Sequence, residues 1–149
     1  MVAVPIFVAY FNCFSGVSGD MCLGAIVDAG VSIENLKREL KKIPITGYMI
    51  SAKRVKKTGL SSTKVDIMQT AKSEEQGAKR WKDIETIIHK SSLSHEIKQK
   101  GLKIFKRLFA AEAKVHGESL NSVHLHELGA VDCIVDIFGT VIGLDMLGV

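Results

Sequence analysis

The spacing of apolar residues along the chain predicts a series of short elements. Apolar residues recur every three or four positions in five stretches, which indicates helices over residues 21–29, 32–42, 81–90, 94–116 and 130–147. Residues 48–55 and 62–69 alternate apolar and polar side chains on either side of Lys57, Thr58 and Gly59, which predicts an antiparallel hairpin. An apolar run over residues 4–12 predicts a buried strand, and a short extended segment is expected around His124.

Serine and glycine residues mark the ends of several of these helices. Ser18, Ser32 and Ser94 stand at helix starts, while Gly30 and Gly117 follow helix ends. Residues 70–79 are polar and predict a loop. The order of elements favours an α+β fold over residues 1–149 as a single domain, with a small, mostly antiparallel sheet of three to four strands and helices packed on it.

The last predicted helix is apolar on nearly all sides, and its exceptions follow one stripe. Asp132 and Asp136 are four positions apart, and Gly139 and Gly143 continue the same face, so this face carries two carboxylates followed by two gaps. Such a face is typical of the wall of a site. A plainer interpretation is that Asp132 favours the helix dipole in the first turn and that Asp136 faces water.

His124, His126 and Glu127 come directly before this helix. In an extended segment the two imidazoles would point to one face and the apolar neighbours to the other. Carboxylates in apolar surroundings need a cation, hydrogen-bond donors or solvent, because an uncompensated buried charge costs several kcal/mol. A divalent ion held by these imidazoles together with Asp132 and Asp136 would meet that need.

Composition narrows the class of protein. With 149 residues and 46% hydrophobic content, the chain can bury a real core. Cys13, Cys22 and Cys133 are an odd number without metal-site spacing, which argues against a disulfide framework and predicts a reducing cytoplasm. The apolar start lacks a basic leader and is too short to span a bilayer, so we expect neither secretion nor a membrane partner.

The net charge of +4 conceals an uneven distribution. All twenty Lys and Arg residues lie within residues 37–114, where eight acids leave a net +12, and the two ends together carry −8. If the ends meet in the fold, they form an anionic centre beside a basic middle segment that could attract phosphates. The alternative is that most of these lysines only solvate helix surfaces. No nucleic-acid partner is expected.

The loop before the first helix contains Ser15, Gly16, Ser18 and Gly19. Backbone N–H groups at such a helix start can bind a phosphate, although the sequence lacks the GK[ST] pattern of a P-loop. Asp20 would compete with a bound anion at this place, so we interpret it as a capping or metal-facing acid.

Two stretches resemble the LarC family of nickel insertion proteins. Residues 13–21 read Cys-Phe-Ser-Gly-Val-Ser-Gly-Asp-Met, and residues 124–132 read His-Leu-His-Glu-Leu-Gly-Ala-Val-Asp, followed by Ile-Val-Asp-Ile at residues 134–137. The resemblance covers this whole chain but only the N-terminal part of the family. It departs from the family in Asn12, where Asp is usual, and in a segment around residues 70–79 that has no histidine.

The resemblance implies insertion of Ni(II) into pyridinium-3,5-bisthiocarboxylic acid mononucleotide, with CTP hydrolysed and Mn(II) or Mg(II) required. It places the nucleotide site in a C-terminal domain that this chain lacks, so the C-terminal half is an expected partner and a homo-oligomer is compatible with it. Asp20, His124, His126, Glu127, Asp132 and Asp136 are then the candidate metal ligands, with Cys13 as a weaker candidate for soft Ni(II).

Two other classes remain open from the residues alone. A stand-alone metal-dependent phosphohydrolase would use the same acids. A non-catalytic assembly domain would use the apolar helices and the surfaces at Gly139 and Gly143 for packing.

Overall fold

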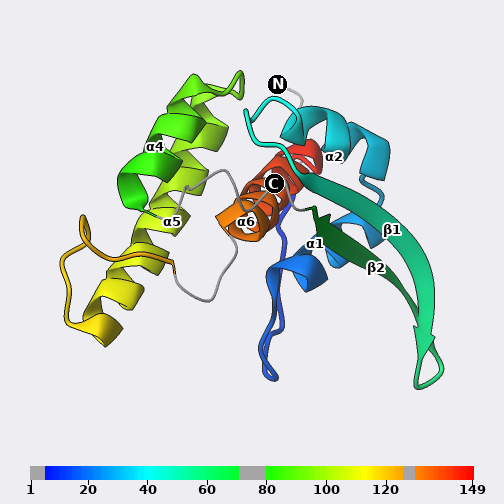
Figure 1. Cartoon of the computed structure of the whole chain (residues 1–149). Helices are drawn as coiled ribbons and strands as arrows, with labels where there is room; N and C mark the ends of the chain where they lie inside the picture. Colours follow the sequence, from blue (N-terminus) through cyan, green and yellow to red (C-terminus); the bar gives the residue numbers. More distant parts are fainter. Residues whose placement is uncertain (1–5, 71–79, 126–129) are drawn as a thin grey trace.

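The computed structural model of the chain describes residues 6–70, 80–125 and 130–149. These residues form an α+β arrangement of five helices and one two-stranded antiparallel sheet (Figure 1). In chain order the elements are α1 (Gly19–Asp28), α2 (Ile33–Leu40), β1 (Tyr48–Lys57), β2 (Leu60–Gln69), α4 (Trp81–Lys90), α5 (His95–His116) and α6 (Ala130–Met146). The five predicted helices are therefore confirmed, with ends that differ by a few residues.

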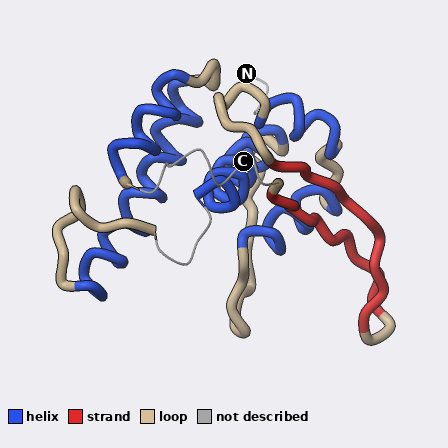
Figure 2. Tube along the Cα trace, in the orientation of Figure 1, coloured by secondary structure: helices blue, strands red, loops and turns tan. Residues whose placement is uncertain are grey.

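The predicted antiparallel hairpin and the place of its turn are confirmed. Tyr48 lies opposite Gln69 at its open end and Lys57 lies opposite Leu60 at its closed end. Two residues connect the strands, and both have positive φ, 50° at Thr58 and 84° at the glycine that follows. Positive φ at both central positions matches the twist of the strands, which is the geometry that a two-residue hairpin needs. Figure 2 shows the ribbon curving away from the helices.

Helix α6 is the centre of the molecule. It contacts α1, α2, α5 and β2, and the other helices surround it in Figure 1. Ile134, Val135 and Phe138 on this helix are completely buried. The ring of Phe138 stacks on Phe105 of α5 with centroids 6.0 Å apart, and Gly101 leaves space for it, because a Cβ there would lie 2.2 Å from the ring. The nearly all-round apolar pattern of the sequence is thus explained by burial.

Helix α1 packs closely against the two glycines of α6. A Cβ on Gly139 would lie 2.8 Å from Leu23 Cδ2, and a Cβ on Gly143 would lie 2.4 Å from Ile26 Cγ2. The gaps in the predicted stripe are therefore filled by side chains of α1. This packing fixes the start of α1 beside the acidic end of the same stripe.

The sheet is smaller than the three to four strands predicted. The expected strand over residues 4–12 is wrong for its described part, since residues 6–12 belong to no strand and side chains such as Val8 and Tyr10 are 82% and 86% exposed. An apolar run becomes a strand only when it pairs with another strand, and residues 6–12 pair with neither β1 nor β2. The segment at His124 forms only an isolated antiparallel bridge with Arg80.

Candidate functional site

The close packing of α1 on α6 places Gly19 directly against Asp136. A Cβ on Gly19 would lie 2.3 Å from Asp136 Cγ and 2.4 Å from its Oδ2, distances that no side chain can occupy. The glycine therefore provides space for a carboxylate of the other helix. The contact between Gly19 and Asp136 brings together the two sequence motifs, residues 13–21 and 124–137, which are more than one hundred residues apart in the chain.

Two buried carboxylate oxygens at this point have no hydrogen-bond partner among the described residues. Asp132 Oδ1 and Asp136 Oδ1 are buried and accept no hydrogen bond from any described residue. Burial, together with the nearby charges of Asp20 and Asp132, raises the pKa of Asp136 to about 6. The arrangement thus concentrates negative charge where it is poorly solvated, which is the condition that a bound cation relieves.

Cysteine thiols adjoin this acidic cluster, which consists of Asp20, Asp132 and Asp136. Burial raises the pKa of Cys22, and the charges of Cys13, Asp136 and Asp20 add to the shift. Burial also raises the pKa of the Cys133 thiol to about 11, with Asp136 and Asp132 contributing. The sequence prediction overlooked Cys22, because residues two apart on a helix point to different faces and only the fold brings this thiol near Asp136.

The loop before α1 is exposed and begins with a turn. Ser15, Gly16 and Ser18 all lie at the surface, and the Gly16 N–H donates to the Cys13 carbonyl at 3.0 Å. Ser18 is at the N-cap position, as predicted, but its hydroxyl donates to Asp20 instead of accepting from the helix backbone. The phosphate-binding prediction for this loop, Ser15, Gly16, Ser18 and Gly19, stays a prediction.

The histidine motif is only partly described. His124 accepts a hydrogen bond at 2.7 Å from Arg80 Nε to its Nε2 atom, so a guanidinium from 44 positions earlier in the chain holds this imidazole. No local pattern in the sequence could have predicted that pair. His126 and Glu127 lie outside the described residues, so their predicted role as ligands stays a prediction.

The family model described as "Nickel insertion protein" matches residues 9–149. The chain belongs to the nickel insertion protein family. It is 45% identical over 141 residues to a putative nickel insertion protein of Syntrophobacter fumaroxidans, a match that covers 95% of this chain and 35% of that relative. It is 44% identical over 147 residues to the pyridinium-3,5-bisthiocarboxylic acid mononucleotide nickel insertion protein of Geobacillus kaustophilus, covering 94% of this chain and 36% of the relative.

The chain thus spans about a third of the length of these nickel insertion proteins, and the matched third is their N-terminal part. No solved structure matches it. None of the helices that the structure describes has both the length and the apolar character needed to cross a bilayer.

The residues of this nickel insertion family member fit a cation only in part. Across residues 6–70, 80–125 and 130–149, no three His, Cys, Asp or Glu side chains form a group that could hold a metal ion. The two partnerless carboxylate oxygens of Asp132 and Asp136 fit a hard divalent cation, and the thiol of Cys22 beside them fits the softer Ni(II). Further ligands would have to come from outside this set.

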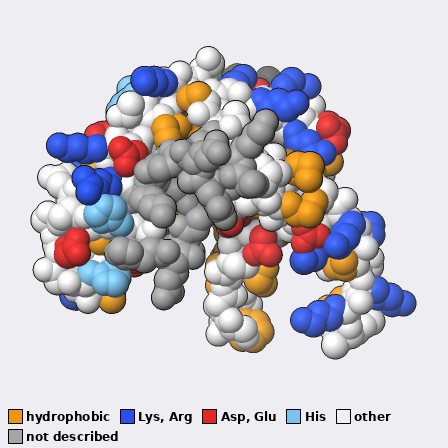
Figure 3. Space-filling view, in the orientation of Figure 1, with side chains coloured by type: hydrophobic (Ala, Val, Ile, Leu, Met, Phe, Trp, Pro, Cys, Tyr) orange, Lys and Arg blue, Asp and Glu red, His pale blue; other side chains and the backbone are white. Residues whose placement is uncertain are grey.

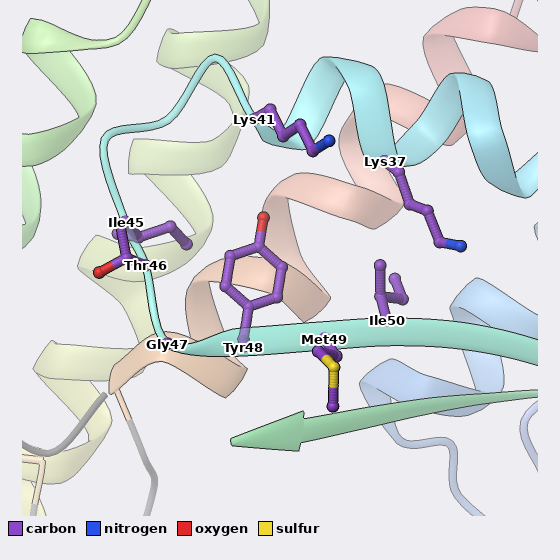
Figure 4. Close-up of a pocket in the computed structure, with 8 residues that line it drawn as sticks. All are labelled: Lys37, Lys41, Ile45, Thr46, Gly47, Tyr48, Met49 and Ile50. Carbon is purple, nitrogen blue, oxygen red and sulfur yellow. The ribbon is translucent and has the colours of Figure 1, made fainter. Parts of the chain in front are cut away.

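A second feature of the family member is a basic pocket of about 530 Å³ between α2 and the start of β1. Lys37 of α2 and Lys41, directly after the end of this helix, line it, and Figure 4 shows the Tyr48 hydroxyl pointing toward the helix, on the side from which the two lysines project. Burial raises the pKa of Tyr48, so its hydroxyl stays a donor. Lys37 also pairs with Glu34 at 2.8 Å. Two ammonium groups and a hydroxyl can bind a phosphate.

The surface charge follows the distribution predicted from the sequence. Lysines and arginines cover α2, the hairpin and the outer helices in Figure 3. Because α1 contacts α6, the two acidic ends of the chain do meet, at the acidic cluster. The predicted anionic centre beside a basic segment is therefore present in the fold.

Proposed function

We propose that this chain is the nickel-handling N-terminal part of a protein that inserts Ni(II) into pyridinium-3,5-bisthiocarboxylic acid mononucleotide, completing the cofactor of lactate racemase. Membership of the family and the names of its relatives support this nickel insertion reaction. In this proposal Ni(II) is a substrate, which ends bound to sulfur and carbon of the mononucleotide. The full-length protein would act as a nickel insertase of the lyase or chelatase class.

The observation that carries the proposal is the pair of buried carboxylate oxygens without partners on Asp132 and Asp136. Together with Asp20 they would attract the divalent ion, and Cys22 and Cys13 would offer sulfur. Oxygen ligands bind Ni(II) less tightly than a full set of imidazoles and thiolates does, so such a site could release the ion to the substrate.

The remaining part of the reaction belongs, in this proposal, to the polypeptide that follows in the longer relatives. That part would bind CTP with Mn(II) or Mg(II), while the basic pocket of this chain attracts the phosphate of the mononucleotide. We also propose that the protein works in the reducing cytoplasm, because Cys13, Cys22 and Cys133 are all unpaired thiols.

Reconstitution tests this division of labour. The purified chain is incubated with nickel, CTP, Mn(II) and the mononucleotide, alone or with the downstream two thirds of the S. fumaroxidans relative made separately, and product is measured by mass spectrometry. We expect no nickel-containing product from either part alone and product from the mixture. Insertion by the 149-residue chain on its own would show that the division is wrong.

The two alternative functions make different predictions in the same samples. A stand-alone phosphohydrolase would hydrolyse CTP or another nucleotide without the downstream part. An assembly domain that used the surfaces at Gly139 and Gly143 is disfavoured, because Leu23 and Ile26 of α1 already fill those gaps.

A further inference from the structure

The segment before α1 exposes an unusual set of apolar side chains. Ile6, Phe7, Val8, Tyr10 and Phe11 are all exposed, with values that reach 89% at Ile6. In Figure 1 the segment leaves the body beside α6, descends and turns back into α1, and Figure 3 shows hydrophobic atoms along it. The exposure is greatest on the side of Ile6, Val8 and Tyr10, while Phe7 and Phe11 are partly covered. A run of large apolar groups that face solvent in this way marks an interaction surface.

The backbone of the same segment is also open. No backbone hydrogen bond joins residues 6–12 to the rest of the described chain. A strand that is apolar on both faces is typical of the interior of a sheet covered on both sides. The segment therefore has the side chains of an interior strand and the free N–H and C=O groups needed to accept a neighbour.

The position of the chain's other end indicates where the neighbour comes from. A Cβ on Gly148 would lie 3.6 Å from Phe7 Cδ2, so the chain ends next to this segment. Val149 also lines a hollow of about 380 Å³ at the ends of α5 and α6, where Ile104, Val141 and Leu144 contribute apolar walls. In the relatives about two thirds of the polypeptide follows the matched part, and it starts from this place.

We propose that residues 6–12 form a β-strand that pairs with a strand of the polypeptide following the matched region in the longer relatives. The partner strand would carry apolar side chains, cover Val8 and Tyr10, and continue over the hollow at Val149. Pairing would also fix the exposed loop that runs from Cys13 to Gly19, and so hold it over Asp136. The surface needed for docking thus adjoins the acidic cluster.

Hydrogen–deuterium exchange tests the pairing. Two proteins are compared, the 149-residue chain and a fusion in which the downstream portion of the S. fumaroxidans relative follows Val149, with circular dichroism to confirm that the fusion is folded. We expect amides of residues 6–12 to exchange at least tenfold more slowly in the fusion. Equal exchange in the two proteins would overturn the proposal.

Variants make the test specific. In the fusion, Val8→Asp with Tyr10→Asp should restore fast exchange over residues 6–12, and the control Leu60→Asp, at an equally exposed apolar residue of the hairpin, should not. Both variants replace exposed side chains, so the melting temperature of the 149-residue chain should be unchanged. Protection that persists in the double variant would contradict the proposal.

A second copy of the chain is the competing partner. Sedimentation and exchange of the 149-residue chain over a hundredfold dilution distinguish it. We expect a monomer with fast exchange at every concentration. A dimer whose residues 6–12 are protected at high concentration would replace the downstream strand as the partner. These measurements need no nickel, so loss of nickel insertion with strand pairing intact would count against the proposed function alone.

Discussion

Asp136 is held where its negative charge is poorly compensated. Its Oδ1 atom has no hydrogen-bond partner among the described residues, and Asp20 and Asp132 repel its charge. An uncompensated buried charge lowers the stability of the folded protein. Such charges occur mainly at functional sites, where a bound ligand compensates them. Gly19 belongs to the same site, because any larger residue at this position would displace the Asp136 carboxylate.

The first prediction concerns the pH dependence of the metal-free protein. The pKa of Asp136 is raised from 3.8 to about 6 in the folded chain, so the folded state binds a proton that the unfolded state has released. Its contribution to stability is present below about pH 4 and is lost as the pH rises through 6. One pKa unit corresponds to about 1.4 kcal/mol, and solvent screening reduces the effect at this half-buried group.

Asp136→Asn should therefore be more stable than the native chain by about 1–2 kcal/mol at pH 7.5 with chelator, and equally stable near pH 4. Urea denaturation between pH 4 and 8 measures this difference. Adding Ni(II) or Mn(II) should raise the melting temperature of the native chain and leave the variant unchanged. A variant that is destabilised equally at all pH values, with and without metal, would show that Asp136 is a structural acid.

The second prediction concerns the space beside that carboxylate. Gly19→Ala puts a methyl group 2.3 Å from Asp136 Cγ, so the start of α1 must shift, at a cost of about 1–3 kcal/mol in the free energy of unfolding. Metal-dependent stabilisation should disappear as well.

Gly101→Ala is the matched control, because its Cβ would lie 2.2 Å from the Phe138 ring, away from the acidic cluster. This variant should lose stability by a similar amount yet keep its response to metal in thermal melts. If Gly19→Ala responds to metal as Gly101→Ala does, the contact between Gly19 and Asp136 has no part in binding the ion.

At the scale of elements, the sequence predicted correctly those elements that depend on interactions between residues close together in the chain. The hairpin and all five helices follow from side-chain periods, caps and turn residues, all of which act within a few positions. The face of α6 that carries Asp132 and Asp136 was predictable for the same reason. The sequence also predicted gaps at Gly139 and Gly143 on this face. It could not show that side chains of α1 fill these gaps, because that requires knowing how two helices pack together.

Elements that depend on distant partners were missed. Residues 6–12 have the apolarity of a strand, yet a strand forms only by pairing with another, and these residues pair with no described strand. The contact of Arg80 with His124 likewise joins positions far apart in the chain. In the candidate site, the meeting of the two motifs was predictable from their composition, whereas the contribution of Cys22 required the fold.

The third prediction belongs to the hairpin. Thr58 has φ of 50°, a left-handed conformation that a β-branched residue adopts at a cost of about 1 kcal/mol, whereas Asn adopts it readily. Thr58→Asn should raise the free energy of unfolding by about 0.5–1 kcal/mol, as measured by urea denaturation. Ser62→Asn, at an exposed position of β2 where φ is not positive, is the control and should change it little. An unchanged or lower stability of Thr58→Asn would show that the turn does not strain this residue.

At the scale of the whole molecule, the charge distribution separates two tasks. The acidic cluster lies where α1 meets α6, and the lysines lie on α2, the hairpin and the outer helices (Figure 3). A cation and an anionic nucleotide would therefore be attracted to different places on one small chain. In the basic pocket, a concave surface and two lysines occur together.

The fourth prediction tests that pocket with nicotinamide mononucleotide as the probe. The double variant Lys37→Gln and Lys41→Gln should weaken binding roughly three- to tenfold, because each exposed ion pair contributes up to about 1 kcal/mol. Binding to the native chain should weaken as salt rises, because exposed charges are screened over about 8 Å at physiological ionic strength. Isothermal titration calorimetry measures both effects.

Lys106→Gln with Lys114→Gln on α5 removes the same charge away from the pocket and serves as the control. Its affinity should stay within about twofold of the native value, since charges beyond a Debye length are largely screened. Equal losses in the two double variants would mean that net charge, and not the pocket, attracts the nucleotide.

The central place of α6 has a consequence for how the protein is made. The helix contacts α1, α2, α5 and β2, yet it is synthesised after all four of them. Until α6 has been synthesised, the apolar faces that later cover Phe138 have no partner, and the chain remains only partly folded. At about 5–20 residues per second, this delay lasts several seconds, during which the exposed apolar surface would be a natural target for chaperones.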